Sequence, residues 1–158
     1  MTLFAAWEDL PIRIATGGFI LSSGLEKLSA DTERAAGLHG FASGAYPVLG
    51  SIPPEQFAKA LAVSEVGLGA ALLLPIVPSR LAGAGLAAFA GGLLGLYLRT
   101  PGMRQEGSFR PTEQGIPLAK DVWMAGAGLS LMVADRRRTG HKRKEHKRKE
   151  KAKETGKA

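Results

Sequence analysis

Residues 57–98 read FAKALAVSEVGLGAALLLPIVPSRLAGAGLAAFAGGLLGLYL, two apolar runs separated by the tripeptide Pro-Ser-Arg at 78–80. As a helix, the first run, 57–77, would be about 31 Å long, close to the hydrocarbon thickness of a bilayer. The second run, 81–98, contains no charge. It is apolar on every face, which the surface helix of a small soluble domain avoids. The two runs therefore predict a transmembrane helical hairpin.

Two weaker apolar segments flank this hairpin, at 10–28 and 117–135. The first is uncharged only from Ile14 to Leu25, and the second carries Lys120 and Asp121 ahead of its apolar run. Charges near helix ends can reach the membrane interface, so both segments are compatible with crossing beside the hairpin. Together the four segments predict an all-α protein, a membrane-spanning antiparallel four-helix bundle. The alternative is a soluble bundle with Leu-, Ala- and Gly-rich core helices.

The segments between these helices are expected to be loops. The segment 31–56 is broken by Gly and Pro, so we predict that it lies at the interface or folds over the mouth of the bundle. The segment 99–116 is polar and also contains several Pro and Gly residues. Within 81–98, small residues recur at every fourth position and predict a close helix contact. These residues are Gly83, Ala87, Gly91 and Gly95.

Positive charge is concentrated in the C-terminal tail, 136–158. It holds 12 of the 21 Lys and Arg but only 3 of the 14 acids, so it carries +9 and leaves −2 for residues 1–135. The repeat HKRKE at 141–150 predicts a disordered tail beside a transmembrane domain, 1–135. Cations directly after the fourth segment place both termini in the cytoplasm. The tail lacks aromatic residues for base stacking, which favours anionic lipid headgroups over nucleic acid as its partner.

Several classes of chemistry are excluded by composition. The chain has no cysteine, so it has no disulfide, thiolate metal site or thiol nucleophile. His39 is the only histidine before the tail, which leaves no pair of imidazoles for a membrane-embedded b-type haem. No phosphate-binding loop or metal-binding spacing occurs. The sequence therefore predicts no metal site and no cofactor within the chain, and it leaves any catalytic residue unknown.

The remaining candidates are charged residues that fall within or beside the predicted helices, toward the same outer half of the bundle. Both signs are present, so ion pairs such as Glu26 with Lys120, or Lys27 with Glu65 or Asp121, would offset the cost of charge in hydrocarbon. These residues predict an outer polar pocket that binds a ligand. They are Glu26, Lys27, Lys59, Glu65, Lys120 and Asp121.

Two of the charged positions have open interpretations. Glu65 is either a functional group, for proton relay or ligand binding, or a structural lock that holds helices in register. Arg13 and Asp135 are expected at similar depth at the inner end of the bundle, where a pair between them would act as a structural clasp.

The sequence resembles the DoxX family of small bacterial four-helix membrane proteins. The similarity rests on Arg13, on Gly18 and Phe19, on the segment SGLEKL at 23–28, and on further residues along 10–135. The further residues are Pro47, Glu65, Gly67, Gly126 and Gly128. The resemblance implies a multi-pass protein of the bacterial plasma membrane, with relatives associated with thiosulfate:quinone oxidoreductase or with oxidative-stress assemblies. It implies that Arg13, Lys27 and Glu65 are recurrent polar positions, and it supplies no catalytic set.

Three hypotheses of function follow. The first is an accessory, non-enzymatic membrane subunit of a redox assembly, whose outer pocket binds a small ligand or a quinone headgroup. The second is a small proton-coupled transporter that uses Glu65, which would require a homo-oligomer because four helices show no inverted repeat. The third is a membrane scaffold whose tail recruits an acidic partner.

Overall fold

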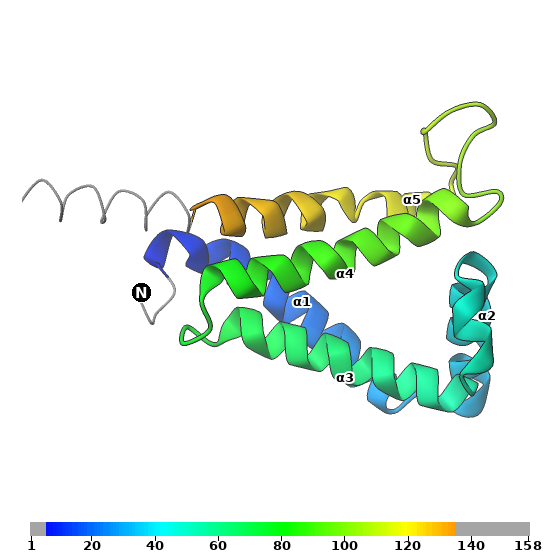
Figure 1. Ribbon diagram of the computed structural model, residues 1–158, viewed down its shortest axis with the longest axis horizontal. Helices are drawn as coiled ribbons and strands as arrows, with labels where there is room; N and C mark the ends of the chain where they lie inside the picture. Colours follow the sequence, from blue (N-terminus) through cyan, green and yellow to red (C-terminus); the bar gives the residue numbers. More distant parts are fainter. Residues whose placement is uncertain (1–5, 135–158) are drawn as a thin grey trace, which may run out of the picture.

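The computed structural model describes residues 6–134, which are mostly helical (Figure 1). The predicted tail, 136–158, and Asp135 lie outside this range. The elements are η1 (Trp7–Asp9), α1 (Leu10–Leu28), α2 (Thr32–Ala45), η2 (Pro47–Ser51), α3 (Pro54–Leu73), α4 (Ser79–Arg99) and α5 (Ile116–Ala119). After a turn at Lys120 and Asp121 the helix continues, so that Ile116–Ala134 forms one apolar segment, called here the last helix. The predicted all-α class is confirmed.

Three helices are long and apolar enough to cross a membrane, namely α3, α4 and the last helix. Large apolar side chains on their outward faces are exposed, as expected for surfaces that contact lipid, among them Val63, Leu81 and Val122. α1 has 19 residues but is not one of these candidates. It carries three charged residues, Arg13, Glu26 and Lys27. A fourth crossing, and with it the complete four-helix membrane bundle, stays a prediction.

Prolines set several of the helix ends. α3 starts at Pro54, before the predicted residue 57, because proline fits the first turn of a helix, where its missing N–H is not needed. It ends at Leu73, before the predicted residue 77, and the chain then turns through residues 74–78 into α4. The hairpin is therefore present, with its turn longer than the three residues expected from the polar break.

The two pairs of long helices form a wedge that α2 closes (Figure 1). α1 runs along α3 and the last helix runs along α4, while α3 and α4 separate with distance from their connecting turn. α2 lies across the open end. The segment 31–56 thus folds over the mouth of the bundle, as one of the two predicted alternatives. This segment also contains the 14-residue helix α2, which the frequent glycines had not suggested. Asp31 is its N-cap, and its carboxylate accepts a hydrogen bond from the Arg34 N–H at 2.8 Å.

Glycines bring α1 and α3 into direct backbone contact. A Cβ atom built on Gly69 would lie 2.7 Å from the backbone nitrogen of Leu21, and one on Gly24 would lie 2.9 Å from the Cβ of Glu65. Neither position has room for a side chain. The contact of these helices therefore depends on small residues on both of them, as is common in membrane bundles.

The stripe of small residues on α4 divides between two neighbours. Gly83 faces the last helix, where an added Cβ would lie 2.6 Å from the carbonyl oxygen of Gly128, and Ala87 packs against that same glycine. Gly95 instead faces the ring of Tyr46, and Gly91 is exposed. The expected close contact is present at three of the four positions, against two different elements.

Replacing Gly69 with alanine is expected to destabilise the protein by about 1–3 kcal/mol, because the new methyl group would overlap the backbone of Leu21. Gly67→Ala is the matched control on the same helix, since an added Cβ there has nothing within 4 Å. Thermal unfolding of both variants in one detergent measures the difference. Equal melting temperatures for the two variants would contradict the close contact of α1 and α3.

Candidate functional site

A cavity of about 330 Å³ lies between the helix pairs, beneath α2. Its floor includes Ile20 and Met124, which also belong to the hydrophobic core. Its walls are mainly apolar, and they include four of the six phenylalanines of the chain. These are Phe19 from α1, Phe41 from α2, Phe57 from α3 and Phe89 from α4. All the long helices and α2 therefore contribute to one chamber.

Four of the six predicted site residues line this cavity, namely Lys27, Glu65, Lys120 and Asp121. They come from three separate helices, since Lys27 lies near the end of α1, Glu65 is in the middle of α3, and the other two form the turn in the last helix. The fold thus gathers two cations and two acids around a largely apolar space, which is the composition expected of a small-molecule site.

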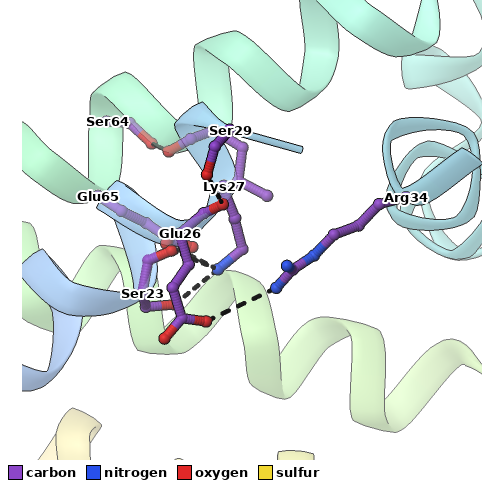
Figure 2. A network of polar contacts seen from close by, with 8 residues as sticks. Ser23, Glu26, Lys27, Ser29, Arg34, Ser64 and Glu65 are labelled. Atoms are coloured by element: carbon purple, nitrogen blue, oxygen red, sulfur yellow. Dashed lines mark hydrogen bonds and ion pairs between the residues drawn. The ribbon is translucent and has the colours of Figure 1, made fainter. Parts of the chain in front are cut away.

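An ion pair between Lys27 and Glu65 joins α1 to α3 at the cavity wall (Figure 2). The Lys27 Nζ atom donates to Glu65 Oε2 at 2.8 Å and to Ser23 Oγ at 2.6 Å. The Glu65 side chain is only 4% exposed and that of Lys27 15%. Of the partners considered from the sequence for Lys27, Glu65 is the one it contacts. Each charge is expensive to bury alone, so the pair stabilises both.

Asp121 is the second buried acid of the cavity, with 6% of the residue exposed. Within residues 6–134 the structure records no hydrogen bond to its carboxylate and no ion pair. Its neighbour Lys120 is exposed. Buried polar groups in proteins almost always have a partner, so an unmatched carboxylate at a cavity wall is a candidate contact for a ligand.

The other two predicted residues lie elsewhere. Glu26 is exposed and points to α2, where Arg34 Nη2 lies 3.7 Å from its Oε2 atom (Figure 2). The expected pair of Glu26 with Lys120 is therefore not formed. Lys59 is also exposed and lines a separate shallow pocket near the start of α2. Neither residue lines the cavity, so the structure does not bring them together with the other four.

α2 forms the roof of the cavity with Leu38, Phe41 and Ala42. Its end is held against α4 by Tyr46, whose hydroxyl donates to the carbonyl oxygen of Gly92 at 2.9 Å. The Arg99 guanidinium lies 4.7 Å from the centroid of the Tyr46 ring. These contacts keep α2 over the opening between α3 and α4.

Arg13 lies at the opposite end of the bundle and performs a structural role. The residue is 1% exposed, and its guanidinium donates five hydrogen bonds of 2.8–3.2 Å. Four acceptors are main-chain carbonyl oxygens at the end of α3 and in the following turn, and the fifth is the Ser79 hydroxyl. The acceptors are those of Leu72, Val77, Ser79, Ala71 and Leu74. Arg13 thus caps the C-terminus of α3, where carbonyl groups lack helical partners.

Two features of the site were missed in the sequence. The first is the roof helix, because its glycines argued against a helix. The second is the aromatic lining. A signal for it was present, since most phenylalanines lie one to each element in helices otherwise made of Leu, Ala and Gly, and aromatic side chains commonly line ligand pockets.

Comparison with known proteins identifies the family. The sequence model of the DoxX family matches residues 9–97, which include Arg13, Lys27 and Glu65. The match ends before the last helix. The resemblance was expected over 10–135, so its part after residue 97, which includes Gly126 and Gly128, lies outside the match. No curated protein and no solved structure matches the chain significantly. Because the matched residues make up more than half of the 158, the chain belongs to the DoxX family.

Proposed function

We propose that this protein is an accessory membrane subunit of a redox assembly, and that the cavity beneath α2 binds a small amphipathic ligand, a quinone headgroup. The observation that carries the proposal is the composition of the cavity. It combines four phenylalanines with a buried ion pair and a second buried acid in about 330 Å³. That volume lies within the range of small-molecule sites, and aromatic walls suit a flat ring.

The polar groups in the cavity wall would orient such a headgroup. Lys27, Glu65 and Asp121 offer charged atoms, whereas the phenylalanines offer apolar faces for the ring. The chain has no cysteine and, within residues 6–134, no cluster of metal-binding side chains. Electrons would therefore pass between the ligand and a cofactor of a partner subunit, which is why we assign an accessory rather than an enzymatic role.

The positive-inside prediction would place the cavity in the outer half of the plasma membrane, because the basic tail follows the opposite end of the last helix. A quinone that diffuses within the bilayer would then approach from the lipid. The proton-carrier alternative is less well supported, because Glu65 already accepts a hydrogen bond from Lys27 and would have to break that pair in each cycle.

Filling the cavity is expected to weaken ligand binding at least about tenfold. Leu93 lines the cavity from α4, so Leu93→Trp would occupy the space of the ring. Leu98→Trp is the matched control, the same substitution on the same helix at a side chain that is exposed and lies outside the cavity lining. Titration of the full-length protein in nanodiscs with a short-chain benzoquinone, followed by calorimetry, measures both.

Either of two results would reject the proposal. One is the absence of saturable binding to the wild-type protein. The other is binding by Leu93→Trp with the same affinity as Leu98→Trp, since binding would then occur at the lipid-facing surface rather than in the cavity. The folded state of each variant is checked beforehand by gel filtration and thermal unfolding.

A further inference from the structure

The charged hydrogen-bond donor inside the cavity, the Lys27 ammonium, is already occupied. A lysine ammonium has three N–H donors. Lys27 directs them to Glu65 Oε2 at 2.8 Å, to Ser23 Oγ at 2.6 Å and, more weakly, to the Ser23 carbonyl oxygen at 3.4 Å. Lys120, the other cation of the lining, is exposed at the rim. Among the described lining residues, the Ser23 hydroxyl keeps an O–H for which no acceptor is recorded, so the donor left inside the cavity is a neutral hydroxyl and not the ammonium.

Acceptor oxygens in the cavity wall, in contrast, have no donor recorded among the described residues. The Asp121 carboxylate is buried and accepts no hydrogen bond from residues 6–134, although an ionised carboxylate has two acceptor oxygens. Glu65 engages Lys27 through Oε2, and no contact to its Oε1 atom is recorded within the same range. A ligand in the cavity that carries a donor group could therefore form a hydrogen bond with these oxygens.

We infer that the cavity selects a ligand whose polar head donates a hydrogen bond to Asp121, so that it binds a hydroquinone in preference to the corresponding quinone. This inference rests on the proposed function. A hydroquinone carries two O–H donors, whereas the carbonyl oxygens of a quinone only accept hydrogen bonds and would face the acceptor oxygens of Asp121. The four phenylalanines contact either ring alike, so they favour neither form. Asp121 is the residue that distinguishes the two forms.

Three ligands with the same decyl tail test this selection. They are the benzoquinone, its hydroquinone, and the hydroquinone dimethyl ether, which keeps the ring but has no donor. Calorimetric titration of the full-length protein in nanodiscs, without oxygen, is expected to give hydroquinone binding at least about tenfold tighter than binding of the other two, since a hydrogen bond to an ionised group is strong enough for that ratio. A tenfold preference would raise the midpoint potential of the bound couple by about 30 mV.

The Asp121→Asn variant tests whether Asp121 causes the preference for hydroquinone. The amide has nearly the same shape, removes the charge and adds N–H donors that quinone carbonyls accept. The ratio of hydroquinone to quinone affinity is therefore expected to fall to about one or to invert. Glu65→Gln provides a second variant, in case Asp121→Asn fails to fold, and it is expected to retain the preference because Asp121 is intact.

The outcomes separate this inference from the function it rests on. If no ligand binds with saturation, the proposed function fails. If quinone and hydroquinone bind equally to the wild-type protein while Leu93→Trp abolishes both, the cavity binds the ligand but the donor preference is wrong. If the preference survives Asp121→Asn, or is lost in Glu65→Gln alone, Asp121 is not the acceptor and its assignment is overturned.

Discussion

Replacing Arg13 with alanine is expected to destabilise the protein by about 3–5 kcal/mol, because five hydrogen bonds are lost together. Arg13 is 1% exposed, and its guanidinium donates to four main-chain carbonyl oxygens and one hydroxyl. Removing it takes the side-chain donor from the carbonyl oxygens of Ala71, Leu72 and Val77, whereas that of Leu74 still accepts from the Val77 N–H. Each lost hydrogen bond is costly in an apolar environment. Arg13→Lys should recover little of the lost stability. A lysine ammonium has three donors and lacks the planar fork of a guanidinium, which reaches acceptors on both sides of the turn.

Unfolding of the purified protein in mixed micelles with increasing SDS measures this effect. Arg80→Ala is the matched control, because Arg80 lies just after the same turn and is exposed. Its effect should stay within about 0.5 kcal/mol. An Arg13→Ala variant as stable as Arg80→Ala would show that the end of α3 is held by other contacts.

The apolar helical hairpin was predictable because its signal is compositional. A run such as 81–98 has no charge and no polar face, so it is stable as a helix only where its whole surface is apolar. The helix ends were less predictable. Pro54 and the turn at 74–78 shifted α3 toward the N-terminus relative to the expected range, since hydropathy measures the length of an apolar run and not where its backbone hydrogen bonds end.

The position of each site residue along its helix was predictable from the sequence, but the side of the helix on which it lies was not. Glu26 and Lys27 are neighbours and so lie about 100° apart around α1, which means that only one of them can face α3. Position along the helix cannot decide which. A periodicity argument would have excluded Lys59, because it lies about 120° around α3 from Glu65, whose own face carries the buried residues Ala62 and Leu72.

The contacts of Arg13 and the roof helix required the three-dimensional structure. Sequence reasoning sought a carboxylate partner for Arg13, since opposite charges are visible in a sequence. The acceptors are instead carbonyl oxygens that become free only where α3 ends. α2 was hidden for a related reason. Its glycines lower helix propensity, and its stability comes from packing over the cavity and from the Asp31 cap, which are tertiary and local backbone effects.

Removing the cation of the buried ion pair is expected to be nearly as damaging as removing Arg13. Lys27→Met leaves the Glu65 carboxylate, 4% exposed, with a negative charge and no cation, which costs about 3–5 kcal/mol. The double variant Lys27→Met/Glu65→Gln removes both charges and should recover most of that loss. SDS unfolding measures all the variants, and Lys59→Met, at an exposed lysine with no ion pair within residues 6–134, is the control.

The double variant also separates the two interpretations of Glu65. A pair that only locks α1 to α3 predicts that the double variant, once stable, binds ligand with the affinity of the wild-type protein. A pair that contacts the ligand predicts restored stability together with binding weakened at least about tenfold. If the double variant is no more stable than Lys27→Met, the coupling between the two charges is absent, and the ion pair holds neither helix in place.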